Sequence, residues 1–224
     1  MNIIKVSEIF YSLQGEGARA GEPSIFIRLQ GCSAKNACYA QGVLCDTEFE
    51  SGTTVDCSEL ERLMARAVHR ASPNGVGQLL NAWIVWTGGE PLDQLNPEIL
   101  SYFKERGYRQ AVETSGIRYV PKETAVLLDW IVCSPKVAEH VLEKNFKDVI
   151  RLSETANVDE LRYVRHAGQP EIPIPSLHAL YYYLSPHSDG AEINKENLKH
   201  CIELCLANPS WKLSVQQHKL WGVL

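Results

Sequence analysis

Three cysteines near the N-terminus have the residue type and spacing to hold an iron–sulfur cluster. Cys32, Cys38 and Cys45 lie within fourteen residues, in a segment otherwise rich in Gly, Ala, Ser and Asn. Three thiolates on a four-iron cluster leave one iron without a protein ligand. That iron can bind the amino and carboxylate groups of S-adenosylmethionine and pass an electron into its sulfonium, which opens radical chemistry.

The spacing Cys-x5-Cys-x6-Cys does not by itself exclude zinc. Three loop cysteines could hold zinc with a histidine or Cys57 as the fourth ligand. Cys57 is a minor candidate ligand, because the start of a helix is expected to lower the pKa of a thiol. Cys133, Cys201 and Cys205 continue apolar patterns, so we expect them in the core.

Apolar periodicity predicts an α/β fold in which strands and helices alternate. Helices are predicted over 56–71, 97–106 and 194–206, the first of them with Asp56 as its N-cap. Strands are predicted over 24–29, 82–86, 110–112, 130–133, 160–164, 180–184 and 212–215. This order implies a mostly parallel sheet, flat or curved into a partial barrel.

Polar or glycine-rich segments follow these strands. The segments are 87–91, 113–116, 134–136, 185–187 and 216–219. Ligands bind at the carboxyl ends of the strands in barrels and open α/β sheets. The sequence therefore predicts one shared site at that edge.

Length and composition favour one globular domain over residues 1–224, because the chain is long enough to bury a full core. The formal net charge is −5, and there is no basic block of the kind that binds a nucleic-acid backbone. No apolar run approaches the roughly 20 residues that span a bilayer, and no signal peptide is visible. We expect a cytoplasmic protein, in which seven cysteines favour metal binding or burial over disulfides.

Motifs spread along nearly the whole chain resemble one known family. They are Glu-Ile-Phe-Tyr-Ser-Leu-Gln-Gly-Glu-Gly at 8–17, Phe-Ile-Arg-Leu-Gln-Gly-Cys at 26–32, Cys-Asp-Thr at 45–47, Thr-Gly-Gly-Glu-Pro at 87–91, Glu-Thr-Ser-Gly at 113–116, Ser-Pro-Lys at 134–136 and Gln-His-Lys at 217–219. Together they resemble the 7-carboxy-7-deazaguanine synthases, radical S-adenosylmethionine enzymes of queuosine biosynthesis. The resemblance implies a partial (β/α) barrel with the cluster at its mouth.

The resemblance also implies a reaction and its partners. The family converts 6-carboxy-5,6,7,8-tetrahydropterin to 7-carboxy-7-deazaguanine with loss of ammonia, and uses a [4Fe–4S] cluster, S-adenosylmethionine and Mg2+. A homodimer is typical of it, and electrons would come from a flavodoxin or ferredoxin. No direct nucleic-acid or membrane partner is implied.

By the same resemblance, some residues are expected to bind the pterin and others the cofactors. The expected pterin-binding residues are Leu13, Gln14, Gly15, Arg28, Thr87, His218 and the terminal carboxylate of Leu224. The expected S-adenosylmethionine-binding residues are Gly89, Glu113, Ser134, Pro135, Lys136, Ser185, Pro186, His187 and Ser188. The expected metal ligands are Cys32, Cys38 and Cys45 for the cluster and Thr47 for Mg2+, with Asp46 as a further Mg2+ candidate.

Several of these residues also have a purely structural interpretation. Arg28 and Glu113 could serve in internal ion pairs, His218 could pack against the sheet, and Asp46 could cap a turn. Gly89 is expected to let S-adenosylmethionine approach the backbone closely, because glycine has no Cβ.

The cysteine loop departs from the family pattern. Gly42 stands where the middle cysteine is expected, so we assign the middle role to Cys38, with Cys57 in reserve. Two other functions remain open at this point. One is a glycyl-radical-enzyme activase, which shares the cluster but acts on a protein; the other is a zinc-stabilised binding module.

Overall fold

The strands of the chain join into one curved sheet. A computed structural model describes residues 3–40, 51–73, 79, 81–151, 155–169, 171–188, 190 and 192–223. Within these residues the sheet has nine strands in the order β3-β1-β2-β4-β5-β6-β7-β8-β9. The strands are β1 (Ile3–Leu13), β2 (Pro23–Leu29), β3 (Thr53–Asp56), β4 (Trp83–Gly88), β5 (Arg109–Thr114), β6 (Trp130–Cys133), β7 (Val158–Arg165), β8 (Ala179–Pro186) and β9 (Lys212–Leu213).

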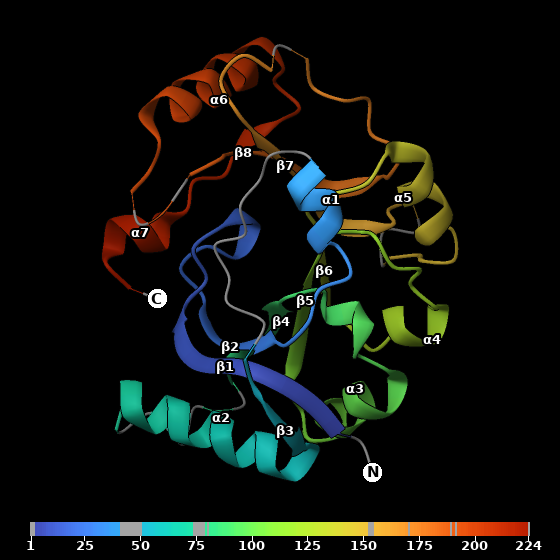
Figure 1. Cartoon of the computed structure of the whole chain (residues 1–224), viewed down its shortest axis with the longest axis vertical. Coiled ribbons are helices and arrows are strands. Elements are labelled where there is room, and N and C mark those ends of the chain that lie inside the picture. Colours follow the sequence, from blue (N-terminus) through green and yellow to red (C-terminus); the bar gives the residue numbers. More distant parts are fainter. Residues whose placement is uncertain are drawn as a thin grey trace.

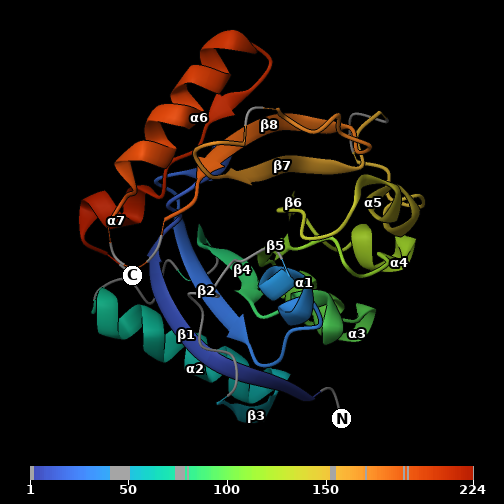
Figure 2. The same cartoon turned by 45° about the horizontal axis from the view of Figure 1, so that its top comes forward.

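The sheet is parallel from β2 to β9, whereas β1 runs antiparallel to both β2 and β3. Figures 1 and 2 show it curving from β1 and β2 to β7 and β8, with helices α2 to α6 on its outer side and α1 at the mouth of the curve. The helices are α1 (Lys35–Ala40), α2 (Cys57–Ala71), α3 (Pro97–Lys104), α4 (Lys122–Ala125), α5 (Glu139–Asn145), α6 (Lys195–Ala207) and α7 (Gln217–Trp221). The predicted α/β partial barrel is therefore confirmed.

Alternation along each strand sends side chains to two different environments. On β2, Ile25 and Ile27 face the helices and belong to the main hydrophobic core. Phe26, between them, faces the inside of the curve, where it joins Phe10 of β1 and Val85 of β4 in a second, smaller cluster. The inner face is thus only partly apolar, and it leaves room for polar groups.

The loop after β1 helps to close the inside of the curve. It includes a short 3-10 helix, η1 (Gly17–Arg19). The amide of Gln217, at the start of α7, donates to the carbonyl of Gly15 at 2.9 Å. The amide of Gly17 donates to the hydroxyl of Ser214, just after β9, at 3.0 Å. The loop after β1 and the segment after β9 therefore contact each other on the inner side of the curved sheet.

Helix α2 follows the sequence rules that predicted it. The Asp56 side chain accepts from the amide of Glu59 at 2.8 Å, as an N-cap does. The apolar stripe of Leu60, Met64 and Val68 is buried against the sheet. Residues 57–71 thus cover β1 and β3 as the periodicity required.

Other elements differ from the prediction. Strand β5 extends to Thr114 and β8 to Pro186, so Glu113 and Ser185 lie within strands rather than in the turns that follow them. Helix α3 ends at Lys104, and β9 has only two residues. The sequence interpretation missed β1, β3, α1, α4, α5 and α7. Among the described helices, none combines the length and apolar character needed to cross a bilayer.

Candidate active site

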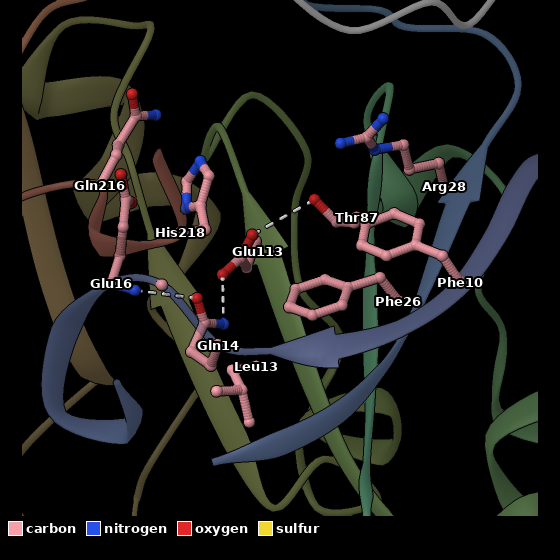
Figure 3. Close-up of a pocket in the computed structure, with 11 residues that line it drawn as sticks. Phe10, Leu13, Gln14, Glu16, Phe26, Arg28, Thr87, Glu113, Gln216 and His218 are labelled. Atoms are coloured by element: carbon pink, nitrogen blue, oxygen red, sulfur yellow. Dashed lines mark hydrogen bonds between the residues drawn. The ribbon is translucent and has the colours of Figure 1, made fainter. Parts of the chain in front are cut away.

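A cavity of about 210 Å³ opens on the inner face of the sheet. It is lined by Phe10, Leu13, Gln14, Gly15, Glu16, Phe26, Arg28, Thr87, Glu113, Gln216 and His218. Figure 3 shows these side chains converging from β1, β2, β4, β5 and the segment around α7. Six of the seven residues expected to bind the pterin line this one cavity, although they lie up to about two hundred residues apart in the chain. The seventh, Leu224, lies outside the described residues.

Glu113 lies at the centre of the cavity. Its carboxylate accepts a hydrogen bond from Gln14 Nε2 at 3.1 Å and another from Thr87 Oγ1 at 3.2 Å (Figure 3). Glu113 was expected to bind S-adenosylmethionine, but the structure groups it with two residues expected to bind the substrate. These contacts orient the carboxylate while leaving it partly exposed to the cavity.

Arg28 lies toward one end of the cavity. Its Nη1 is 2.7 Å from the Glu8 carboxylate, and its guanidinium lies 4.9 Å from the centroid of the Phe10 ring. Phe10 in turn stacks on Phe26, with ring centroids 4.9 Å apart. The internal ion pair that the sequence left open is therefore present, yet the side chain remains half-exposed and lines the cavity.

A second carboxylate, Glu16, lines the side of the cavity away from Arg28 (Figure 3). It is 3.0 Å from Nη1 of Arg162, a buried residue of β7. Burial raises the pKa of Glu16 above its ordinary value; Arg162 opposes this shift and Glu113 adds to it. The cavity therefore carries a cation toward one end, one carboxylate at its centre and a second carboxylate on the side away from the cation.

Two of the three expected cluster ligands, Cys32 and Cys38, follow the carboxyl end of β2. Cys32 follows Gly31, and Cys38 lies in α1; both thiols are partly exposed. Soft thiolates in this position suit an iron–sulfur cluster, so the described part of the ligand set fits one. Cys45, Asp46 and Thr47 lie outside the described residues. Within the described part of the chain, no group of three His, Cys, Asp or Glu side chains is arranged to bind a metal ion.

The expectation for the Cys57 thiol is wrong. Cys57 is 4% exposed and belongs to the main core beneath α2. Burial and the neighbouring Asp56 raise the pKa of its thiol, whereas the helix start was expected to lower it. Desolvation outweighs the helix dipole here, because the thiol points into the core rather than into solvent.

Gly89 packs against the cysteine loop. A Cβ at this position would lie 1.7 Å from the carbonyl oxygen of Gly31 and 3.2 Å from Cys32 Cβ. The space that a side chain would need is therefore already filled by the chain itself. This contact accounts for a glycine at position 89 without a cofactor; the expected role toward S-adenosylmethionine stays a prediction.

The turns expected to bind S-adenosylmethionine are tied to one another. The buried Glu90 carboxylate accepts from Thr114 Oγ1 at 2.7 Å and from the Ser115 amide at 2.9 Å. The amides of Ser134 and Lys136 donate to the carbonyls of Thr114 and Ser115, at 2.8 and 3.0 Å. The segments that follow β4, β5 and β6 are thus hydrogen-bonded to one another, and Pro135 lies between the two bonded residues of the last segment.

The last expected cofactor segment lies on β8 and just beyond it. Ser185 and Pro186 end the strand, and Ser188 Oγ accepts from the amide of Asn194 at 3.3 Å. The His187 ring stacks on His166 with centroids 4.2 Å apart. The segment therefore lies at the same edge of the sheet, two strands from the Ser134–Lys136 turn.

Sequence reasoning missed several residues of the cavity and its support. Phe10, Phe26, Glu16 and Gln216 line it, and Arg162 supports it from β7. Glu16 was visible within the quoted motif at 8–17, and Phe26 within the motif at 26–32. Arg162 carried no local signal, because an arginine in an alternating strand usually faces solvent.

Comparison with known proteins places the chain among close relatives. No family model matches it. It is 31% identical to the 7-carboxy-7-deazaguanine synthase of Nitratidesulfovibrio vulgaris, over 98% of each chain. It is 34% identical to that of Bradyrhizobium diazoefficiens, over 97% of this chain and 98% of the relative. The synthase of Bacteroides thetaiotaomicron is 31% identical over 96% of both chains.

A solved structure supports the fold. QueE from Escherichia coli superposes with a TM-score of 0.59 at 21% identity, covering 96% of this chain and 94% of that one. These relatives do not favour the activase or the zinc module. From its full-length similarity to the synthases, the chain belongs to the 7-carboxy-7-deazaguanine synthase family.

Proposed function

We propose that the chain catalyses the radical ring contraction of 6-carboxy-5,6,7,8-tetrahydropterin to 7-carboxy-7-deazaguanine, with release of ammonia. Family membership supports the reaction. The single observation that supports it most directly is the cavity, since it unites Gln14, Arg28, Thr87 and His218, which the family motifs had marked for the substrate.

The charges of the cavity match such a substrate. A carboxylated pterin has an anionic group at one end and an amino-pyrimidinone edge with N–H donors at the other. Arg28 suits a carboxylate, because a planar guanidinium can donate two parallel hydrogen bonds. Glu16 and Glu113 can accept from N–H groups. We therefore assign Glu113 to the substrate rather than to S-adenosylmethionine.

The remaining substrate contacts follow the same proposal. Leu13 and Gly15 contribute backbone groups and contact surface, and Thr87 and His218 contribute polar side chains beside Glu113. The terminal carboxylate of Leu224 is proposed to close over the substrate.

Cys32, Cys38 and Cys45 would hold a [4Fe–4S] cluster, and the edge from Gly89 to Lys136, with Ser185–Ser188, would hold S-adenosylmethionine. When bound, the cluster supplies the electron for reductive cleavage of S-adenosylmethionine, and thereby the radical that removes a hydrogen atom from the substrate. The inner face of the sheet orients the substrate and limits the access of water to it. Thr47, with Asp46, is proposed as the Mg2+ ligand, because Mg2+ prefers oxygen ligands.

Partners and location belong to the same proposal. We expect a homodimer in the cytoplasm, reduced by a flavodoxin or ferredoxin. Neither nucleic acid nor membrane takes part directly.

The test of the function is an anaerobic turnover assay. The chain, reconstituted with iron and sulfide, is given 6-carboxytetrahydropterin, S-adenosylmethionine, Mg2+ and a strong reductant, and the products are identified by mass spectrometry. We expect 7-carboxy-7-deazaguanine without stoichiometric consumption of S-adenosylmethionine. If 5′-deoxyadenosine forms alone, the substrate assignment is rejected.

The middle cluster ligand has a separate test. We expect Cys38→Ala to lose the iron and sulfide retained by the wild type after anaerobic desalting. The matched variant Cys57→Ala should retain both, because Cys57 lies in the core. Full retention by Cys38→Ala would reject our ligand assignment.

A further inference from the structure

A buried arginine beneath the cavity contacts three carboxylates at once. Arg162, on β7, is 3% exposed. Its Nη2 is 2.9 Å from Glu160, its Nη1 is 3.0 Å from Glu16, and the same Nη1 is 3.6 Å from Glu113. Burial alone would lower the pKa of its guanidinium, but the three carboxylates raise the pKa above the ordinary value. Arg162 is therefore charged.

One edge of the guanidinium is fixed away from the cavity. Glu160 is fully buried; its Oε2 accepts from Nε of Arg162 at 3.0 Å and lies 2.9 Å from Nη2 of the same residue. Its other oxygen, Oε1, accepts from Trp130 Nε1 at 2.8 Å and from the Ala18 amide at 3.3 Å. Both oxygens of Glu160 are thus engaged, and Glu160 acts as a permanent counter-ion that sets the angle of the guanidinium plane.

The other edge of the guanidinium faces the cavity. Nη1 donates to Glu16 and lies within ion-pair distance of Glu113. These two carboxylates come from different elements, the loop after β1 and strand β5, and Arg162 is the cation between them. Glu113 is also held by Gln14 and Thr87, as described above, whereas Glu16 has Arg162 as its charged partner.

We propose that Arg162 is a positioning residue that holds the carboxylates of Glu16 and Glu113 at the separation and charge needed to bind the N–H donors of the substrate. This inference rests on the proposed function. Arg162 does not line the cavity, so it acts through the two carboxylates rather than on the substrate.

The loop that carries Glu16 is shaped around this pair. A Cβ on Gly17 would lie 1.9 Å from Glu160 Oε2 and 2.6 Å from Arg162 Nη2. The backbone of the loop therefore approaches the ion pair as closely as only glycine allows. Arg162 Nη2 also donates to the carbonyl of Glu16 at 3.4 Å, so both the side chain and the backbone of Glu16 contact Arg162.

Arginine is required here for its shape. Its planar fork can serve Glu160 along one edge and the cavity along the other. A lysine keeps the charge, but its single ammonium cannot span both edges. Arg162→Lys therefore separates geometry from charge.

The test compares Arg162→Lys with Arg151→Lys. Arg151 is also a buried arginine in a carboxylate pair, with its Nε 2.9 Å from Asp159, but it lies outside the cavity lining. For Arg162→Lys we expect the KM for the pterin to rise about 10-fold. This is the effect of losing one charge-assisted hydrogen bond between a displaced carboxylate and the substrate. The KM for S-adenosylmethionine and the visible absorbance of the cluster should stay unchanged. Arg151→Lys should lower the melting temperature and leave both KM values unchanged.

Binding gives a second readout that does not depend on turnover. Calorimetric titration with 7-carboxy-7-deazaguanine should show the same loss of affinity in Arg162→Lys and none in Arg151→Lys. If Arg162→Lys does not fold, Glu160→Gln takes its place, because it frees the anchored edge of the guanidinium. Glu160→Gln should raise the KM for the pterin and leave that for S-adenosylmethionine unchanged.

Two results would overturn the proposal. One is an unchanged KM for the pterin in the folded variant. The other is an equal rise in both KM values, which would indicate a merely structural role. Failure of the proposed function is distinguishable, because the wild type would then form no 7-carboxy-7-deazaguanine.

Discussion

The two faces of the curved sheet are built from the same strands but differ in role: the outer face packs against the helices, and the inner face lines the cavity. The outer face meets the helices through a large cluster of aliphatic and aromatic side chains, such as Ile27, Trp86 and Phe103. Among the residues that the structure describes, the inner face has a cluster of five buried residues with one partly buried neighbour, and a set of buried charges. Successive side chains of a strand point to opposite faces of the sheet. The residues that stabilise the fold therefore alternate along each strand with the residues that face the cavity.

This separation has an energetic reason. Apolar burial on the outer face stabilises the fold by roughly 25 cal/mol per Å². Buried charges on the inner face stabilise it little, because desolvation offsets their attraction. Charges such as Arg162 and Glu160 are therefore better explained by the geometry that they impose on the cavity than by a gain in stability.

The largest effect is expected at Gly89, directly after the end of β4. Gly89→Ala would place a methyl group 1.7 Å from the Gly31 carbonyl, so the loop that begins at Cys32 must move. We expect loss of the cluster, measured as iron and sulfide per chain. Gly107→Ala is the control, because its Cβ would meet nothing within 4 Å and only its φ of 83° resists substitution. Normal cluster content in Gly89→Ala would contradict the packing explanation.

On the outer face, Phe103→Ala should lower the free energy of unfolding by about 3–5 kcal/mol. Phe103 is fully buried in α3 and makes edge-to-face contacts with Trp86, Tyr102 and Tyr108. Chemical denaturation measures the loss. Both KM values should stay at the wild-type level at temperatures where the variant is folded. A selective rise in the KM for the pterin would show that the two faces are not independent.

On the inner face, Glu113→Gln should weaken binding of the pterin about 10- to 100-fold, the range for one hydrogen bond to a charged group. Steady-state kinetics measures the change, and the KM for S-adenosylmethionine serves as an internal reference. The neighbouring Val112 faces the outer core, so Val112→Ala should instead lower stability and leave both KM values unchanged. A rise in the KM for S-adenosylmethionine alone would return Glu113 to its earlier assignment.

The same alternation explains how far the sequence could be interpreted. Apolar runs such as Ile131–Cys133 predicted strands correctly, because the run is a local property of the sequence. The Asp56 cap of α2 was equally local. Motif residues such as Gln14, Thr87 and His218 could be assigned to one site before the fold was known, and the structure brings them to one cavity.

The sequence could not predict which part of the protein surrounds the polar face of a strand. Residues 160–163 alternate like a strand with one solvent-exposed face, yet Glu160 and Arg162 are buried on the inner side of the curved sheet. The period of two gives the polar face but not its surroundings. Burial likewise reversed the expected effect on Cys57. Strand β1 was missed because half-buried polar and aromatic residues interrupt its alternation.

The smallest effect concerns the charge of Glu16. Its pKa in the folded chain is raised above the ordinary value of 4.5. The folded state therefore binds this proton more tightly than the unfolded state, and the resulting stabilisation is present below about pH 4.5 and is lost as the pH rises through the raised pKa. Glu16→Gln removes this dependence.

Relative to Glu16→Gln, the wild type should thus lose stability as the pH rises from about 4.5 through the raised pKa of Glu16. Denaturation of both proteins across this range, at matched cluster content, measures the difference. The Gln variant should also bind the pterin more weakly at neutral pH, because it loses a charged acceptor. If the wild type instead gains stability relative to the variant with rising pH, the attraction of Arg162 outweighs the burial of Glu16, and the inner face would stabilise the fold as well as bind the substrate.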